Sequence, residues 1–353
     1  MQLKYLKGRG AQSNVKNEFL KNEIVQDHIE GLDEPLQQLK PQTELYYENP
    51  KNIISKNDSP DLGWTNSINP YQGCEHGCVY CYARNSHQYW GFSAGLDFES
   101  KIIVKKEAPA LLEKKFLSKY WKPSVIMLSG NTDCYQPLEK KFKLTRQLLA
   151  VILKYRNPVG LITKNSLITR DIDILSELAR LNLVTVHISI TTLDEKLRGR
   201  MEPRTASSKK RMETVKKLSE AGVPVGVMVA PIIPGLNNHE IPKIIEQAAK
   251  NGARSIGHNV VRLNGQVSII FKDWIAKNYS DRATKVWNLI STLHGGKVND
   301  SEWGRRMKGD GNIAESIRQM IELSKKKYLS DKEPLPELDC TKFRKRGNYS
   351  LFE

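Results

Sequence analysis

The chain has 353 residues, 39% of them hydrophobic, which suits one large domain or two smaller ones and excludes a disordered chain. The longest apolar run, residues 223–233, is too short to cross a bilayer, and the polar first residues do not resemble a secretory signal. We therefore expect a cytoplasmic protein without a membrane association. The 55 lysines and arginines against 39 acids give a net charge of +16, which indicates either a polyanionic partner or a lysine-rich surface without one.

Residues 1–60 are polar and irregular, and we interpret them as an N-terminal extension wrapped on a core. Residues 61–264 alternate short apolar runs with amphipathic stretches at helical spacing. A strand is predicted at 67–71, and six further strands at 102–104, 125–128, 159–163, 184–190, 223–230 and 256–263. Several of these runs are continuously apolar, as parallel strands buried on both faces are. The pattern predicts an α/β fold, a partial (β/α)6 TIM-like barrel, with a flat doubly wound sheet as the alternative.

Helices are predicted between these strands. Pro137 suits a first helical turn, Ser207 can cap the next amphipathic stretch, and Asn238 can cap another. Residues 265–330 read as a helical C-terminal segment, and residues 331–353 as a linker and basic tail.

The stretch CEHGCVYC holds Cys74, Cys78 and Cys81, three of the five cysteines. A structural zinc site needs four ligands, so the zinc alternative requires His76 or His87 as the fourth. A [4Fe–4S] cluster normally takes four cysteines, and three would leave one iron open for another ligand. The predicted strand before this stretch places the cysteines on a βα loop, where (β/α) barrels carry their chemistry.

Cys-x₃-Cys-x₂-Cys with an aromatic residue, Tyr80, before the last cysteine resembles the motif of the radical S-adenosylmethionine superfamily. The resemblance implies a [4Fe–4S] cluster on the three cysteines whose open iron binds S-adenosylmethionine. It also implies an external one-electron donor of the flavodoxin or ferredoxin kind. Reductive cleavage of the cofactor then gives methionine and a 5′-deoxyadenosyl radical.

A narrower resemblance covers nearly the whole chain. The stretches SINPYQGCEHGCVYCYAR, GNTDCYQP, LITKNSLITRD, MEPRT and VGVMVAPIIPGLN, together with GRGA at 8–11 and RMKGDG at 306–311, are similar to the branch that includes spore photoproduct lyase. This resemblance implies a lyase-like or repair-like reaction on nucleic acid. A small-molecule or protein substrate, and a non-enzymatic zinc- or cluster-bearing nucleic-acid-binding module, are the alternatives.

The resemblance also assigns cofactor contacts. They fall on the ends of predicted strands, at Ser129, Gly130, Asn131, Thr132, Lys164, Ser189 and Thr191, with Tyr80 on the cysteine loop. Lys164 would face the methionyl carboxylate. The alternative for Ser129–Thr132 is an ordinary turn between a strand and a helix. For Ser189 and Thr191 the alternative is the normal preference of such residues for strands.

Three further features leave alternatives open. Cys134 resembles the cysteine that donates a hydrogen atom in the photoproduct-lyase branch. In that branch the cysteine precedes a Ser/Thr-Asp pair, whereas here it follows Asp133. The alternative is that Cys134 is a small buried thiol without a catalytic role. Glu202 and Arg204 either pair locally or face the substrate. Trp303, beside two arginines, either packs or stacks on bases.

The last residues, GNYSLFE, resemble the peptide by which bacterial replication and repair proteins bind the sliding clamp. Leu351 and Phe352 would fill the clamp's apolar pocket. A tail that packs these side chains on its own barrel is the alternative. The sequence assigns no role to Cys340.

Overall fold

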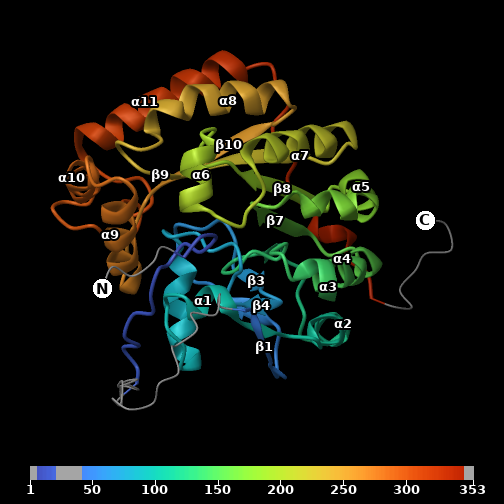
Figure 1. Cartoon of the computed structure of the whole chain (residues 1–353). Helices are drawn as coiled ribbons and strands as arrows, with labels where there is room; N and C mark the ends of the chain where they lie inside the picture. The colour runs from blue at the N-terminus through green and yellow to red at the C-terminus, as the bar shows by residue number, and fades with distance from the viewer. Residues whose placement is uncertain (1–5, 21–41, 346–353) are drawn as a thin grey trace, which may run out of the picture.

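The computed structural model describes residues 6–20 and 42–345, whose central feature is a seven-stranded sheet (Figure 1). The strands follow the order β10 (Ser255–Val260), β9 (Val225–Ile232), β8 (Val184–Ser189), β7 (Val159–Thr163), β6 (Ile126–Leu128), β3 (Asn66–Ile68) and β2 (Ile54–Lys56). Every neighbouring pair is parallel except β2 and β3, which are antiparallel. The predicted α/β fold with a parallel sheet is confirmed.

The core of the sheet comes from its continuously apolar strands. The β7 and β8 side chains of Val159, Leu161, Val184, Val186 and Ile188 are at most 1% exposed. Burying each such side chain contributes about 1.5–3 kcal/mol. Because these residues alternate along the two strands and pair in register, they form one fully buried face of the sheet, whereas Ile162 and His187 on the other face are partly buried.

The predicted strand at 102–104 forms, but it does not belong to this sheet. As β5 (Lys101–Val104) it pairs with β1 (Glu44–Tyr47) and β4 (Tyr71–Gln72) in a separate three-stranded sheet. The place of the first parallel strand is taken by β3. The predicted strand at 67–71 is therefore wrong in extent: it is divided between two sheets at Pro70, which has no backbone N–H to donate to a ladder.

Helices cover the sheet, and two predicted helix starts need correction. The long helices are α2 (Ala108–Leu117), α4 (Leu144–Tyr155), α5 (Ile172–Arg180), α7 (Ser208–Glu220), α8 (Ile241–Lys250), α9 (Gln266–Asn278), α10 (Ala283–Leu293) and α11 (Gly311–Tyr328). The short ones are α1 (Asp97–Ser100), α3 (Glu139–Phe142) and α6 (Glu195–Met201). Ser207 caps α7 as predicted, but Asn238 accepts from the Gly235 N–H instead of capping α8. The helix predicted from Pro137 breaks at Lys143, whose φ of 51° separates α3 from α4.

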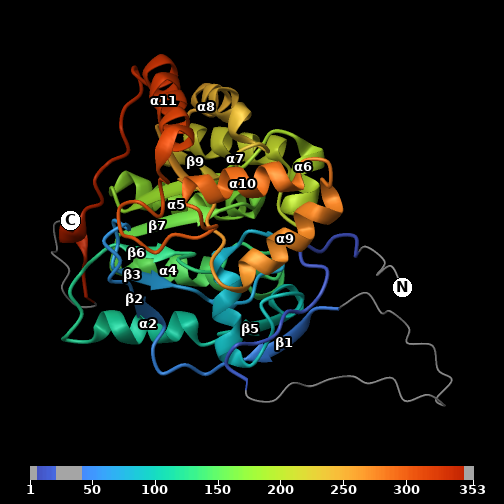
Figure 2. The same ribbon diagram turned by 90° about the vertical axis from the view of Figure 1, so that its left-hand side faces the viewer.

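The helical segment after β10 packs in two places. Helix α11 lies alongside α8 on the outside of the sheet, as Figures 1 and 2 both show, and α9 packs against the short helix that follows the cysteines. The predicted boundaries at residues 60, 264 and 330 remain predictions. No helix among the described residues is both long and apolar enough to span a membrane.

The N-terminal segment docks directly on the cysteine loop. The N–H groups of Gly10 and Ala11 donate to the Glu99 carboxylate over 3.1 and 2.8 Å, and the same carboxylate forms a buried ion pair with Arg84. A Cβ on Gly10 would lie 1.8 Å from the carbonyl oxygen of Gly77, which stands between two of the cysteines. Only glycine fits this close approach of two backbones.

Gly10→Ala is therefore expected to lower the free energy of unfolding by about 1–3 kcal/mol, the usual cost of overpacking. The clash is with backbone, so no side-chain rotation relieves it. Chemical denaturation measures the effect, and Gly63→Ala is the matched control because nothing lies within 4 Å of its added Cβ. Equal losses in the two variants would contradict the docking.

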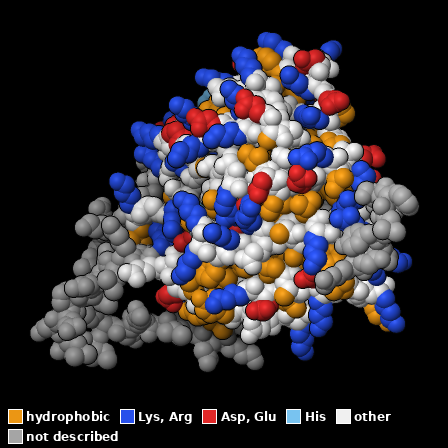
Figure 3. All heavy atoms as spheres, turned by 90° about the vertical axis from the view of Figure 1, so that its right-hand side faces the viewer, with side chains coloured by type: hydrophobic (Ala, Val, Ile, Leu, Met, Phe, Trp, Pro, Cys, Tyr) orange, Lys and Arg blue, Asp and Glu red, His pale blue; other side chains and the backbone are white. Residues whose placement is uncertain are grey.

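The residues before the end of the described chain pack on the rest of the protein. Phe343 packs edge-on to Phe116 with ring centroids 5.6 Å apart, and the Arg344 N–H donates to the Tyr155 carbonyl over 3.0 Å. The clamp-like residues 348–352 lie outside the described residues. Basic side chains are spread over the face drawn in Figure 3, where acidic and hydrophobic side chains interrupt them.

Candidate active site

The three clustered cysteines lie on the loop between β4 and a 3₁₀ helix, η1 (Tyr82–Trp90). Cys74 and Cys78 are buried, and Cys81 is half-buried immediately before η1. The Cys74 N–H donates to the Phe98 carbonyl over 2.8 Å, and the Arg84 Nε donates to the Cys78 carbonyl over 2.9 Å. One loop, anchored to the surrounding chain, therefore presents all three thiols.

Burial raises the pKa of all three thiols, and the charge of Asp133 adds to this effect at Cys74. Lys164 acts in the opposite direction on Cys78 and Cys81. A bound metal centre replaces the thiol protons and supplies the missing positive charge. Three soft sulfur donors on one loop fit an iron–sulfur cluster.

His76, one of the two histidines available to a zinc site, is already engaged. Its Nδ1 lies 3.3 Å from Asp133 Oδ2, and its Nε2 lies 3.2 Å from Asn165 Nδ2. The paired His76 lowers the pKa of Asp133 to about 2, although burial of the carboxylate opposes the change. Within residues 6–20 and 42–345, no three His, Cys, Asp or Glu side chains are grouped to hold a single metal ion.

His87 is buried in an aromatic environment. Its ring centroid lies 5.2 Å from that of Phe92 and 5.6 Å from that of Phe98, and neither ring nitrogen has a hydrogen-bond partner in the described part of the chain. Burial lowers the pKa of His87 to about 4. The imidazole is therefore neutral in the folded protein at neutral pH.

A pH-dependent loss of stability follows from this histidine. Below pH 6.5 the unfolded chain gains a proton at His87 that the folded chain does not, so stability present above pH 6.5 is lost as the pH falls towards 4. We expect the wild type to lose about 3 kcal/mol more than His87→Phe between pH 7 and 4. Denaturant unfolding at several pH values measures the difference. If the free energy of unfolding depended on pH in the same way in both proteins, the prediction would be refuted.

The loop after β6 carries four of the predicted cofactor contacts. Asn69 Oδ1 accepts from the N–H of Asn131 over 2.8 Å, and Thr132 Oγ1 donates to the Tyr71 carbonyl over 2.5 Å. Ser129 Oγ accepts from the Cys134 N–H over 2.8 Å. Gly130 packs tightly, because a Cβ there would lie 2.7 Å from Ser67 Cβ. The structure thus places Ser129–Thr132 beside the cysteine loop, with much of their hydrogen bonding used to hold that position.

Tyr80 and Thr191, two further predicted contacts, meet at a buried carboxylate. Glu202 is fully buried and accepts from the Tyr80 hydroxyl and, over 2.6 Å, from Thr191 Oγ1. Arg211 Nη2 donates to the same carboxylate over 2.5 Å. Although burial opposes it, the positive charges of Arg211 and Lys164 lower the pKa of Glu202 to about 2.

This network shows that Glu202 and Arg204 pair within the protein, and it includes Arg211, which the sequence analysis did not identify. Glu202 pairs locally, and Arg204 likewise contacts Glu75 on the cysteine loop over 3.2 Å. Arg211 reads in sequence as the end of a basic run with two exposed lysines, yet its side chain is only 1% exposed. A basic residue on the otherwise apolar face of a predicted helix was the available signal.

Lys164 and Ser189 stand on neighbouring strands of the same edge. Lys164 follows β7, and its Nζ lies 5.9 Å from the centre of the Tyr80 ring. Ser189 ends β8, and its carbonyl accepts from Arg211 Nη1 over 3.0 Å. The predicted contacts therefore gather around the cysteine loop, while their roles as cofactor ligands remain predictions.

Cys134, the predicted hydrogen-atom donor, lies in the main hydrophobic core. Its side chain is 0% exposed, and burial raises the pKa of its thiol. This position is the one expected of a buried small thiol, and any contact with a substrate requires local rearrangement.

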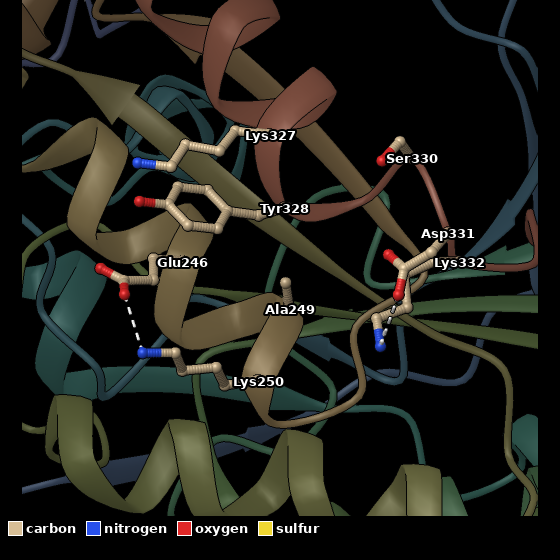
Figure 4. Close-up of a pocket in the computed structure, with 8 residues that line it drawn as sticks. All are labelled: Glu246, Ala249, Lys250, Lys327, Tyr328, Ser330, Asp331 and Lys332. Atoms are coloured by element: carbon tan, nitrogen blue, oxygen red, sulfur yellow. Dashed lines mark hydrogen bonds and ion pairs between the residues drawn. The ribbon is translucent and has the colours of Figure 1, made fainter.

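A surface hollow between α8 and α11 lies outside this group of residues (Figure 4). The figure shows Lys250 paired with Glu246 over 2.7 Å, and Lys332 lying beside Asp331. These four charged groups form two pairs, which leaves Lys327 as the remaining cation of the lining, and we assign the hollow no function.

A parallel α/β sheet with a three-thiol loop held at the carboxyl ends of its strands defines a class of enzymes that depend on a bound cofactor. The profile of the Radical SAM superfamily matches residues 68–248, just over half of the chain. The chain therefore belongs to the radical SAM superfamily and is an enzyme of that family. Membership implies S-adenosylmethionine and an iron–sulfur cluster as cofactors.

The related sequences are largely uncharacterized. The chain is 28% identical to an uncharacterized protein of Mycobacterium tuberculosis over 63% of this chain and 66% of that protein. It is 33% identical to an uncharacterized protein of Methanocaldococcus jannaschii over 48% of this chain and 61% of that protein. It is also similar to the sporulation killing factor maturation protein of Bacillus subtilis, with 31% identity over 51% of this chain and 38% of that one. The matches cover less than two thirds of each relative.

Among solved structures, spore photoproduct lyase complexed with dinucleoside spore photoproduct has a similar fold. The TM-score is 0.60 with 15% sequence identity, and the match covers 81% of this chain and 80% of that one. At this identity the likeness concerns the fold alone, and it agrees with the fold predicted from the sequence.

Proposed function

We propose that the chain holds one [4Fe–4S] cluster on Cys74, Cys78 and Cys81 and cleaves S-adenosylmethionine reductively. The observation that carries this proposal is the single anchored loop that presents three of the five cysteines. When bound, the cluster supplies the electron that breaks a carbon–sulfur bond of the cofactor. An external flavodoxin- or ferredoxin-like protein would deliver that electron.

The chain's own residues would orient the cofactor. Lys164 would bind the methionyl carboxylate, since its ammonium group faces the cysteine loop. Ser129–Thr132 would meet the methionyl amino group. Ser189 and Thr191 would meet the ribose. Glu202 would hold Tyr80 and Thr191 in position.

We further propose nucleic acid as the substrate. The charge of +16 favours a polyanionic partner, and the solved structure with the similar fold contains a dinucleoside photoproduct. We also propose a cytoplasmic location, because all five cysteines are free thiols in the described part of the chain and disulfides are rare in that compartment. The alternative, radical chemistry on a small molecule or protein, predicts no salt-dependent binding of oligonucleotides.

The test is anaerobic reconstitution of the full chain. Reconstituted protein is expected to bind about four irons and, after reduction, to convert S-adenosylmethionine to 5′-deoxyadenosine and methionine. Colourless protein that contains zinc would refute the proposal.

Cys134 remains our candidate hydrogen-atom donor. Because its thiol is buried, the role requires the loop after β6 to open when substrate binds. Cys134→Ala is expected to lower substrate turnover relative to cofactor cleavage, measured as product formed per 5′-deoxyadenosine. An unchanged ratio would assign this thiol to core packing.

A further inference from the structure

Arg262 is a half-buried arginine just after β10, the edge strand of the seven-stranded sheet. It makes no hydrogen bond or ion pair with any described residue. Val260 donates to the Met307 carbonyl over 3.0 Å, and Leu263 donates to the Val298 carbonyl over 2.9 Å. These two bonds hold Arg262 alongside the loop of residues 298–307.

The acids near Arg262 are committed to other arginines. Asp300 pairs with Arg305 Nε over 2.6 Å, and Asp61 pairs with Arg306 Nε over 2.5 Å. Burial and the charge of Arg306 lower the pKa of Arg262, and the negative charges of Asp61 and Asp300 offset this change only in part. A guanidinium group in this situation gains most from an anion with two oxygen acceptors.

Tyr82 connects Arg262 to the cysteine loop. It follows Cys81 directly, and its hydroxyl donates to the Gly130 carbonyl over 2.7 Å. The helix η1 that begins at Tyr82 lies beside the segment after Arg262, because Asn85 Nδ2 donates to the Asn264 carbonyl over 2.9 Å. The tyrosine side chain is nonetheless 52% exposed, which leaves its ring accessible beside the cluster ligand.

Trp303 extends this surface on the same loop that lies beside Arg262. Its side chain is 54% exposed, and the Arg306 guanidinium lies 3.9 Å from the ring centroid. Arg306 is fixed in turn by Asp61 and by Ser59, whose Oγ accepts from it over 2.7 Å. One face of the indole is thus covered and held, and the exposed remainder is available for stacking.

We propose that Arg262, Tyr82 and Trp303 form a subsite for a nucleic-acid strand, in which Arg262 binds a backbone phosphate and the two aromatic rings stack on adjacent bases. An unpaired guanidinium between exposed aromatic rings is the arrangement that single-stranded nucleic acid requires. A methionyl carboxylate is a poorer occupant, because Lys164 already faces the cysteine loop from β7. The subsite rests on the proposed nucleic-acid substrate and specifies where the strand is held.

The experiment is fluorescence anisotropy with a short labelled single-stranded oligonucleotide and the reconstituted full chain, over a range of salt concentrations. Arg262→Gln is expected to weaken binding about tenfold and to reduce the slope of log K against log salt by about 0.7, the contribution of one phosphate. Lys209→Gln removes the same charge from an exposed position on α7 and is expected to leave affinity within about twofold of the wild type. Trp303→Ala is expected to weaken binding about tenfold without changing the slope, and to have no effect on an abasic strand.

Equal behaviour of Arg262→Gln and Lys209→Gln would overturn the subsite, as would wild-type protein that binds no oligonucleotide at low salt. Matching thermal unfolding midpoints for the wild type and the variants establish that a loss is not misfolding. Cofactor cleavage is measured on the same wild-type preparation. Arg262-dependent binding without cleavage would refute the radical chemistry alone, and cleavage without any oligonucleotide binding would refute the nucleic-acid substrate and the subsite together.

Discussion

Cys78→Ala is expected to abolish conversion of S-adenosylmethionine to 5′-deoxyadenosine. The loop offers three thiols and no nearby replacement, so removing one leaves an iron of the cluster without its protein ligand. Reconstituted variant should contain clearly fewer than about four irons, and chromatography should detect no 5′-deoxyadenosine above the background of unreduced protein. Cys74→Ala and Cys81→Ala should behave in the same way.

Cys340→Ala is the matched control for this experiment. Cys340 is a half-buried free thiol in the 3₁₀ helix η4 (Cys340–Lys342), outside the cysteine loop. Its removal should leave iron content and cleavage at wild-type levels. Full cleavage by Cys78→Ala would exclude the proposed cluster.

Glu202→Ala is expected to lower the free energy of unfolding by about 3–5 kcal/mol, the usual cost of breaking a buried ion pair. The substitution leaves Arg211 charged and 1% exposed, and it deprives the Tyr80 hydroxyl of its acceptor. Denaturant unfolding at pH 7 measures the loss. Below about pH 4.5 the gap between wild type and variant should narrow, because the pKa of Glu202 is low and its stabilisation is lost as the pH falls towards 2.

Two further variants test whether the loss of stability comes from the broken ion pair or from a general effect of substitution. Adding Arg211→Met to Glu202→Ala removes the unpaired charge and should recover part of the lost stability. Glu220→Ala removes an exposed carboxylate at the end of α7 that lies 3.7 Å from Lys216, and it should change stability little. If Glu202→Ala were as mild as Glu220→Ala, the buried network would not be a stabilising element.

The sequence predicted the parts of the fold that depend on local patterns. Apolar residues located β7 and β8 because alternate side chains of each strand are fully buried on one face of the sheet. The same reasoning misplaced β5, since a three-residue apolar run carries no information about which strand it pairs with. Its partner, β1, comes from a segment that reads as irregular.

In the candidate site, too, a pattern of neighbouring residues could be predicted, whereas contacts between residues of different elements could not. The cysteine spacing is contained in eight residues and needs no structure to be seen. The Glu202–Arg211 pair and the unpaired Arg262 could not be predicted, because each depends on which side chains approach from other elements. The place of Arg211 on the apolar face of a predicted helix indicates its burial, but nothing in the sequence indicates that Glu202 is its partner.

The contact between Gly10 and the cysteine loop also has a consequence for how the enzyme is made. Its hydrogen bonds to Glu99 span 88 and 89 residues, so the segment that braces the loop leaves the ribosome well before the carboxylate that receives it. The loop therefore reaches its final shape only after a long stretch of chain has closed on itself. A shortened form beginning after residue 11 would lose two of the hydrogen-bond donors to Glu99. Gly10 and Ala11 are in this respect a part of the cofactor site that is completed late.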